Sequence, residues 1–332
     1  MKAVWYERKG PAREVLVVGE MPTPTPGPGE VLVRVHASAV NPTDTKGRAG
    51  LRSKDMPYPR IVPHQDGAGV IEDVGPGVDR GRIGQRVWIY EAQWNRPFGT
   101  CAEFTVVPDA NAVPLPDGVP FEAGAMMGIA AMTAHRCVFA DGSVDGKTVL
   151  VTGGAGSVGR FAIQFAKHGG ARVITTVGSP EQADSARSAG ADVVIDRHRE
   201  DVVARIAEAT GAPQGRGVDR IVDVNFGSNL PVSLQVLRPN GVIATYSSDA
   251  EPEPKVPFLS LLVLDATIRV VLVYMMSKQA HEEAAQAITQ AFREGWLSCP
   301  TGQTFPLAEA WRAHDAVEAG GQLGKVLVLP QV

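Results

Sequence analysis

The stretch Gly146–Lys167, "GKTVLVTGGAGSVGRFAIQFAK", decides the fold. Its apolar run Thr148–Val151 predicts a buried strand, a G-x-G-x-x-G follows, and the residues after it have the spacing of a helix. Glycines let a backbone approach a pyrophosphate, and a helix N-terminus offers free N–H groups and the positive end of a dipole. We therefore predict a dinucleotide site rather than a merely structural turn. Its expected residues are Gly154, Gly156, Ser157, Val158 and Gly159.

The residues around this stretch repeat the same alternation of strand and helix. Apolar runs "ARVITTVG", "DVVID", "RIVDV" and "GVIATY" are separated by segments with helical spacing, such as "PEQADSARSAG". Such alternation predicts βαβ units and a parallel sheet, hence an α/β fold. The first 120 residues or so differ, because short apolar runs there are separated by Pro and Gly, a texture that predicts a mostly β domain. Residues 278–296 predict an amphipathic helix, and "GKVLVLP" returns to β texture.

Composition limits the possible functions. A chain of 332 residues is long enough for two domains, and its formal net charge of -4, without a basic run, argues against a nucleic-acid surface. Cys101, Cys137 and Cys299 are too few and too scattered for a disulfide framework or a CxxC cluster, which fits the reducing cytoplasm. The start, "MKAVWYERKG", does not have the apolar core of a signal peptide.

The most apolar stretch, Phe258–Met276, is interrupted by Asp265 and Arg269 and is therefore not expected to span a membrane. Its second half, "TIRVVLVYM", is rich in β-branched residues. This predicts a buried strand, either inside a sheet or at a subunit contact.

The position after the second strand of the parallel sheet indicates which dinucleotide binds. NAD sites place an Asp or Glu about 20 residues after the last glycine, but this chain has Gly178 and Ser179 there. A carboxylate would repel a 2′-phosphate by about 3 kcal/mol at about 5 Å and an effective dielectric of about 20. Its absence permits NADPH, and Arg197 or Arg187 could bind the 2′-phosphate, although either could be a solvated surface charge.

With these motifs in view, the chain resembles the medium-chain dehydrogenase/reductase superfamily, in its zinc-free, zeta-crystallin-like NADPH:quinone oxidoreductase branch. The resemblance covers nearly the whole chain and is carried by "ASAVNPTDTKGRAG", "DGAGVIEDVG", "GTCAEF", the stretch quoted first, "AGADVVID" and "GKVLVL". Ser157 departs from the glycine usual in the branch. The resemblance implies a Rossmann doubly wound parallel sheet domain over residues 123–277 and a mostly β, GroES-like catalytic domain over 1–122 and 278–332.

Zinc members of the superfamily hold a catalytic metal through a Cys in "GVCHTD" and a His in "GHE", and they carry a structural lobe of four Cys. Here Asn41 stands in place of the Cys, and Gln65 in place of the His when the segments are aligned on Gly69. His64 is then out of register. Because zinc needs three or four His, Cys or carboxylate ligands, we expect no metal. His64 is expected to be a loop histidine bonded to backbone or, alternatively, to contact the substrate.

Without zinc as a Lewis acid, the resemblance implies hydride delivery from NADPH to an acceptor that is already electrophilic. It places "NPTDTK" beside the nicotinamide, which makes Asn41 a candidate hydrogen-bond donor and Asp44 a loop organiser. Lys46 stands where relatives often have Tyr. It could favour an acidic or thioester substrate over a quinone, or simply face solvent. Tyr58 is a further candidate for the pocket lining.

The resemblance also implies several cofactor contacts. Thr133 is expected near the nicotinamide ribose, Asn225 after the strand "RIVDV", Tyr246 and Ser247 at the end of "GVIATYSS", and Lys325 in the last "GK". Each has a plainer alternative: Thr133 could cap a helix, Asn225 could close a turn, and Lys325 could be a surface residue.

The leading hypothesis is a zinc-independent reductase that transfers hydride from NADPH to a quinone. A second enzyme hypothesis is NADPH-dependent reduction of the double bond of an enal, enone or enoyl thioester. A third is a non-enzymatic, crystallin-like NADPH-binding protein. A cytoplasmic homodimer, joined through the strand around residues 267–275, is expected in each case.

Overall fold

The computed structural model describes residues 1–212 and 215–331. The chain divides into two compact units, which we call the discontinuous unit (Met1–Ile129 and Ala285–Val332) and the central unit (Ala130–Ala284). The central unit thus begins at Ala130 rather than at residue 123 and ends at Ala284 rather than at residue 277. Each of these boundaries falls inside a helix, α4 (Gly128–Phe139) and α10 (Lys278–Glu294).

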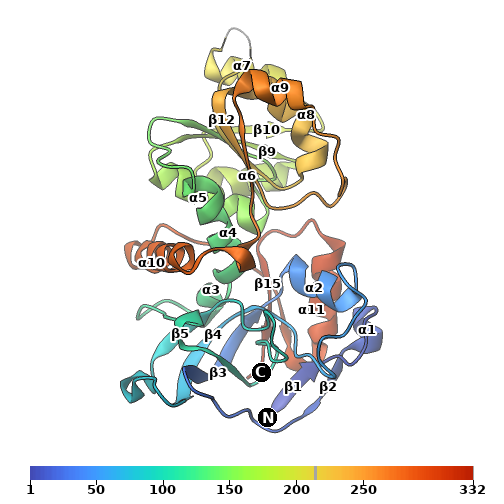
Figure 1. The fold of residues 1–332 in the computed structure, drawn as a ribbon, viewed down its shortest axis with the longest axis vertical. Coiled ribbons are helices and arrows are strands. Elements are labelled where there is room, and N and C mark those ends of the chain that lie inside the picture. The colour runs from blue at the N-terminus through green and yellow to red at the C-terminus, as the bar shows by residue number, and fades with distance from the viewer. Residues whose placement is uncertain (213–214, 332) are drawn as a thin grey trace. The chain divides into compact units, whose positions relative to one another are not determined.

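The central unit contains a six-stranded sheet in the order β10-β9-β8-β11-β12-β13, with every neighbouring pair parallel. This confirms the predicted α/β fold with a Rossmann-type sheet. Figure 1 shows these strands with their helices. The elements are β8 (Thr148–Val151), α5 (Ser157–His168), β9 (Arg172–Val177), α6 (Pro180–Ser188), β10 (Val193–Asp196), α7 (Val202–Thr210), β11 (Val218–Asp223), α8 (Phe226–Val236), β12 (Leu237–Thr245), α9 (Phe258–Leu264), β13 (Thr267–Val270) and η3 (Val273–Met275).

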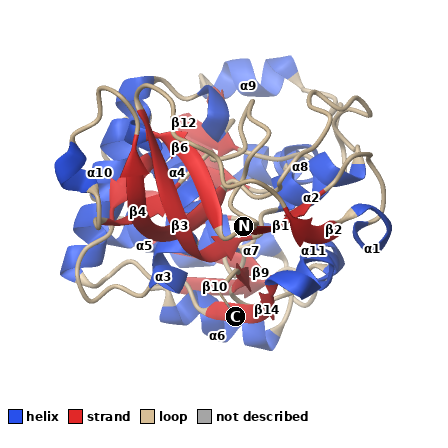
Figure 2. Ribbon diagram, turned by 90° about the horizontal axis from the view of Figure 1, so that it is seen from below, coloured by secondary structure: helices blue, strands red, loops and turns tan. Residues whose placement is uncertain are grey.

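The discontinuous unit contains a seven-stranded sheet with the path β14-β15-β3-β4-β5-β7, and β6 also pairs with β3. Figure 2 shows β3, β4 and β6 side by side. The elements before the central unit are β1 (Lys2–Trp5), α1 (Ala12–Val15), β2 (Val17–Glu20), β3 (Glu30–Ala39), α2 (Pro42–Ala49), β4 (Asp66–Val74), η1 (Arg80–Arg82), β5 (Arg86–Ile89), β6 (Phe104–Pro108), η2 (Asp109–Asn111), β7 (Ala112–Pro114) and α3 (Phe121–Ala125). Those after it are β14 (Thr301–Pro306), η4 (Leu307–Glu309), α11 (Ala310–Ala319) and β15 (Lys325–Leu329).

Strand direction in the discontinuous unit brings distant parts of the sequence to one end of its sheet. β3 runs antiparallel to both β4 and β15, with Ala39 opposite Asp66 and also opposite Leu327. The end of β3 therefore lies beside the beginnings of β4 and β15. Alternate β3 residues such as Val31, Val33 and Val35 are fully buried, so the register is fixed by the core.

The apolar stretch Phe258–Met276 folds differently from the single buried strand expected in its second half. Its first part is α9, and only Thr267–Val270 forms a strand, β13, at the edge of the central sheet. Val270 is 78% exposed, so this strand is not inside the sheet. In the described part of the chain, no helix is long and apolar enough to cross a membrane.

Candidate nucleotide-binding loop and buried polar cluster

The predicted phosphate loop joins β8 to α5 in the central unit. A side chain is sterically excluded at two of its glycines: a Cβ on Gly154 would lie 2.1 Å from Thr175 Oγ1, and one on Gly159 would lie 2.3 Å from the Gly153 carbonyl oxygen. Gly156 differs, because its nearest neighbour would be 3.4 Å away. The first and last glycines therefore serve close packing, and the middle one leaves open space beside the backbone.

The first turn of α5 has the free donors that an anion needs. Gly156 precedes the helix, and no side chain caps it. The backbone N–H groups of Ser157, Val158 and Gly159 have no hydrogen bond to another described residue. With the helix dipole behind them, these donors fit a pyrophosphate. The sequence-predicted residues of the loop thus form one site, and the residues present fit a dinucleotide.

Two charged side chains of opposite sign follow β9 and β10: Glu181 is in α6, and Arg197 comes directly after β10. A Cβ on Gly178 would lie 3.0 Å from the Arg197 guanidinium, so this exposed arginine lies over the end of β9. Ser179 caps α6 by accepting from Gln182 N, and its hydroxyl donates to Glu181 Oε2 at 2.8 Å. Sequence reasoning missed Glu181, whose carboxylate favours a ribose 2′-hydroxyl while Arg197 favours a 2′-phosphate. Arg187 instead pairs with Asp184.

The other predicted cofactor residues of the central unit lie on α4 and after β11 and β12. Thr133 is buried within α4, so it does not cap that helix. Asn225 directly precedes α8 and donates through Nδ2 to Ser228 Oγ. Tyr246 N donates to the Asp223 carbonyl, and the Ser247 carbonyl accepts from Phe226 N. Asn225, Tyr246 and Ser247 therefore stand together at the carboxyl ends of neighbouring parallel strands, where such sheets bind ligands.

A polar cluster is buried where β3, β4 and β15 meet in the discontinuous unit. Its members are Asn41, Asp44, Asp66 and Lys325, and each is at most 6% exposed. Asn41 Nδ2 donates to Asp66 Oδ2 at 2.8 Å, and Lys325 Nζ donates to Asn41 Oδ1. Asp44 Oδ2 accepts from Asn41 N at 2.7 Å, which organises the start of α2. Burial excludes the alternative in which Lys325 is a surface residue.

The orientation of the Asn41 amide follows from its two partners. An ammonium group can only donate, so the side that faces Lys325 must be Oδ1. Nδ2 then faces Asp66, which takes one of its two hydrogens. The Lys325 charge at Oδ1 polarises the amide and strengthens its Nδ2–H groups as donors, and the bond to Asp66 fixes their direction.

Burial shifts the pKa values of both carboxyls in the cluster. Desolvation raises the pKa of Asp44 to about 7, opposed mainly by the hydrogen bond from Asn41 N, and Oδ1 of this side chain is buried without a partner. Desolvation likewise raises the pKa of Asp66 to about 6, opposed by the charge of Lys325. Because a buried charge is costly, Lys325 and the hydrogen-bond donors are what keep Asp66 ionised at neutral pH.

The two remaining catalytic candidates are Lys46 and Tyr58. Lys46 is half-buried in α2, two residues after Asp44. Tyr58 donates its hydroxyl to the Asn95 carbonyl and packs beside a small core of Tyr6, Val15 and Ile61. A structural role for Tyr58 is therefore visible.

His64 is fully buried in the loop before β4, and its ring does not make the expected bonds to backbone. Its ring contacts the side chains Ser38 and His314 rather than backbone groups, and full burial keeps it from solvent. Within residues 1–212 and 215–331, no group of three or more His, Cys, Asp or Glu side chains could hold a metal ion.

Asp66, Ser38, Thr100 and His314 are the polar residues of this region that sequence reasoning missed. Asp66 had one usable signal, since it is a carboxylate at the start of the apolar strand "DGAGV". The other three carry no local signal, because their partners lie far away in the sequence.

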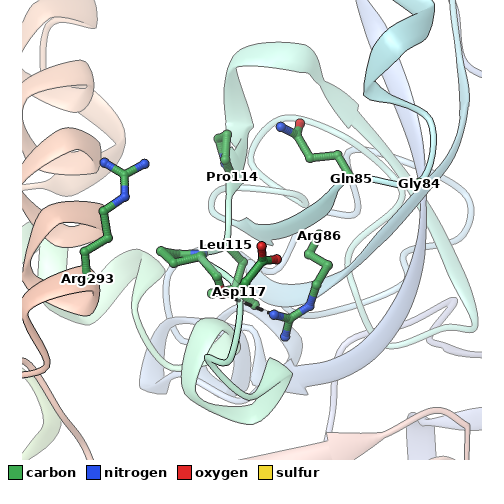
Figure 3. Close-up of a pocket in the computed structure, with 8 residues that line it drawn as sticks. Gly84, Gln85, Arg86, Pro114, Leu115, Asp117 and Arg293 are labelled. Carbon is green, nitrogen blue, oxygen red and sulfur yellow. Dashed lines mark hydrogen bonds between the residues drawn. The ribbon is translucent and has the colours of Figure 1, made fainter.

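A separate hollow of about 500 Å³ lies in the discontinuous unit between Gln85, Arg86, the turn after β7, and Arg293. Figure 3 shows Arg86 turned toward the turn, where it donates to the Pro116 carbonyl. None of the predicted site residues lines this hollow, so it is not the candidate site.

Two family models match the chain: "Zinc-binding dehydrogenase" over residues 157–290 and "Alcohol dehydrogenase GroES-like domain" over residues 27–117. Among curated proteins, the quinone oxidoreductase of Rattus norvegicus is 30% identical over 98% of this chain and 96% of its own length. The 2-haloacrylate reductase of a Burkholderia species is 32% identical over 100% of this chain and 99% of its own.

Solved structures show the same fold. An NAD-dependent alcohol dehydrogenase is 31% identical, with a TM-score of 0.90 over 99% of this chain and 100% of that one. The Escherichia coli quinone oxidoreductase complexed with NADPH is 26% identical, with a TM-score of 0.86 over 99% and 100%. The neighbours thus include proteins described with each of the two nicotinamide cofactors.

The pKa of Asp44 predicts a pH-dependent stability. An unfolded chain loses this proton near pH 4, whereas the folded protein loses it near pH 7. The folded state therefore binds more protons between these values, and the stability that Asp44 contributes is lost as pH rises through about 7, by about 1.4 kcal/mol per unit of pKa shift. In Asp44→Asn this loss is absent. The melting temperature of Asp44→Asn minus that of the unaltered protein should therefore be larger at pH 8 than at pH 5.

The matched control is Asp117→Asn, an exposed aspartate, whose melting temperature relative to the unaltered protein should be the same at both pH values. Differential scanning calorimetry at pH 5, 6, 7 and 8 measures both. An Asp44→Asn difference that does not change with pH would contradict the burial argument.

Proposed function

Since the chain belongs to the medium-chain dehydrogenase/reductase superfamily, in its quinone oxidoreductase branch, we propose that it is a zinc-independent oxidoreductase that transfers hydride from NADPH to a quinone. The observation that carries this proposal is the cluster of Asn41, Asp66 and Lys325. A buried ammonium group beside Asn41 repels a divalent cation, and an amide that is already bonded on both sides is a poor zinc ligand.

A nicotinamide dinucleotide, when bound, supplies the hydride. The chain contributes the means of holding it: the N–H groups of Ser157, Val158 and Gly159 for the pyrophosphate, and Arg197 for a 2′-phosphate. We assign Thr133, Asn225, Tyr246 and Ser247 to the remainder of the cofactor on their position in the strand-end crevice and on α4.

The Asn41 amide is the group we assign to the acceptor. Hydride addition to a quinone leaves negative charge on an oxygen, and a fixed, polarised N–H stabilises that charge. Lys325 supplies the polarisation through Asn41 Oδ1. The resulting hydroquinone anion is stable enough to take its proton from water, so no dedicated general acid is required. Asp44 acts by organising the loop that carries Asn41.

A second candidate reaction is reduction of an activated carbon–carbon double bond. It is favoured by the similarity to the 2-haloacrylate reductase and by Lys46, a cation four residues before the end of the "NPTDTKGRAG" segment that could attract an acidic substrate. Cofactor and donors are the same in both reactions, so only the acceptor separates them.

The acceptor is tested by single turnover. Protein is loaded with one equivalent of NADPH, and absorbance at the nicotinamide band is followed after addition of an ortho-quinone or, separately, of an enal. We expect rapid loss with the quinone. The variant Asn41→Ala should slow it by roughly 10² to 10³-fold, the usual cost of removing a donor to a developing anion.

A matched control is Asn111→Ala, since Asn111 lies at η2 and bonds only the Tyr90 carbonyl through its side chain. Loss of absorbance with the enal alone would transfer the assignment to double-bond reduction. An Asn41→Ala rate equal to that of the unaltered protein would remove Asn41 from the reaction.

Cofactor preference is expected to depend on Arg197 and Glu181. Removing the cation in Arg197→Gln should raise KM for NADPH roughly tenfold or more and leave KM for NADH unchanged, because only NADPH carries the 2′-phosphate. Glu181→Gln should lower KM for NADPH. Steady-state kinetics with both nucleotides measure this, with Arg199→Gln as the control on the neighbouring exposed arginine. Equal KM values for NADPH in Arg197→Gln and the unaltered protein would refute the assignment.

We also propose that the protein is a homodimer in the cytoplasm, joined through β13. This strand pairs with β12 on one side and forms the edge of the sheet on the other. Val270 in the strand is 78% exposed, and Met275 in the following η3 is 72% exposed. An edge with free backbone groups and apolar side chains is suited to pairing with a second copy across a two-fold axis. Apolar residues of α9, the helix that precedes β13 in the chain, are also exposed, with Val263 at 80%.

Light scattering at micromolar concentration should give twice the chain mass of 35.2 kDa. Val270→Lys, which places a charge at the contact, should give the single-chain mass. Val17→Lys, the same change at an exposed valine of β2, should leave the dimer intact. A single-chain mass for the unaltered protein would disprove the dimer.

A further inference from the structure

A second buried network lies beside the Asn41 cluster and contains two histidines that the proposed reaction does not use. Ser38 on β3, His64 and Thr100 in loops, and His314 on α11 are all 0% exposed. Ser38 Oγ lies 2.8 Å from His64 Nδ1 and 2.7 Å from Thr100 Oγ1, and His64 Nε2 lies 2.9 Å from His314 Nε2. Thr100 Oγ1 donates to the Asp66 carbonyl at 2.7 Å.

The proton positions in this network follow from its last bond. The Asp66 carbonyl has no proton, so Thr100 must donate to it, and Ser38 must then donate to Thr100. Ser38 can now only accept from His64, which places the His64 proton on Nδ1. His64 Nε2 is left with a lone pair, so His314 Nε2 must be the donor between the two rings. The bonds run in one direction, from His314 through His64, Ser38 and Thr100 to Asp66.

Both rings are neutral, which this assignment requires. Burial, together with the charge of Lys325, lowers the pKa of His64 to about 3. Burial, together with His64 and Arg48, lowers that of His314 well below the ordinary value. The network therefore keeps one proton pattern throughout the physiological pH range.

The network ends on the residue that holds the Asn41 cluster together. The Asp66 carboxylate accepts from Asn41 Nδ2 and, at 3.0 and 3.1 Å, from Ile129 N. His64, two residues before Asp66, has a φ of 80°. This left-handed conformation is uncommon outside glycine and needs support from neighbouring groups. Its ring bonds and the bond from Thr100 N to its carbonyl supply that support.

We propose that His64 and His314 are positioning residues: as a fixed-tautomer chain ending at Thr100, they hold the Asp66 main chain so that its carboxylate orients the Asn41 amide. The catalytic part of this inference rests on the proposed function. The chain of donors itself does not, and the two are tested separately.

The chain of donors is tested by ¹⁵N NMR of the imidazole rings in the unaltered protein at pH 7. We expect His64 to carry its proton on Nδ1 and His314 to carry its proton on Nε2. Half-buried His36 on β3 serves as a reference ring outside the network. A His64 proton on Nε2, or titration of either ring between pH 5 and 8, would overturn the assignment, whatever the protein's activity.

The positioning role is tested by Thr100→Val, which keeps the shape of the side chain and removes the proton that Asp66 accepts, and by Thr100→Ser, which restores that proton. In folded protein, Thr100→Val should lower kcat for the quinone about tenfold or more without changing the Kd for NADPH, since small misplacements of a reacting group are costly. Thr100→Ser should recover most of the rate.

A merely structural network would lower the melting temperature of Thr100→Val and leave kcat per folded molecule unchanged, and that result would refute positioning. A control is Thr105→Val, a second fully buried threonine of the same unit, which should keep kcat. If the unaltered protein oxidised no NADPH with any acceptor, the proposed function would fail, and the NMR result would still decide whether the chain of donors exists.

Discussion

The candidate active centre depends on the hydrogen bonds that the buried Asp66 carboxylate accepts. A charge without solvent must be satisfied by donors, and Asp66 takes them from three separate parts of the chain: the Asn41 side chain, the Ile129 backbone and, through Asn41, the Lys325 ammonium. The carboxylate is also closely packed, because a Cβ on Gly128 would lie 2.1 Å from Asp66 Oδ1. Satisfying one carboxylate therefore sets the orientation of the Asn41 amide.

The candidate anion site of the central unit consists of backbone N–H groups and one arginine. The unit leaves donors unpaired at the start of α5 and places Arg197 over the end of β9. Glycine is required at Gly154 and Gly159 by packing against neighbouring atoms, and at Gly156 it leaves the approach open. Glu181, which accepts from Ser179, adds a negative charge near the end of β9, so the proposed cofactor preference involves two residues of opposite charge.

Much of the fold was predictable because its signals are local. The alternation of apolar runs and helical segments after residue 120 predicted the parallel sheet, and the glycine motif after Thr148–Val151 predicted the loop between β8 and α5 where the candidate phosphate site lies. Asn41 and Lys325 were found through the family resemblance, but the bond between them was not, because 284 positions separate them. The same holds for His64 and His314, which are 250 positions apart. Such contacts depend on which strands become neighbours, and no local sequence pattern indicates that.

The apolar stretch around β13 shows a local signal that predicted too much structure. Its β-branched residues favoured a longer strand, but the strand lies at the edge of the sheet and the η3 turn follows it, so it is short.

The central claim is that hydrogen bonds among Asn41, Asp66 and Lys325 take the place that a metal occupies in related dehydrogenases. Its most direct test is the zinc content of the purified protein by plasma mass spectrometry, together with the rate of NADPH oxidation before and after dialysis against a chelator. A hydrogen-bonded centre predicts far less than one zinc per chain and an unchanged rate. One zinc per chain, with activity lost on chelation and restored by added zinc, would contradict it.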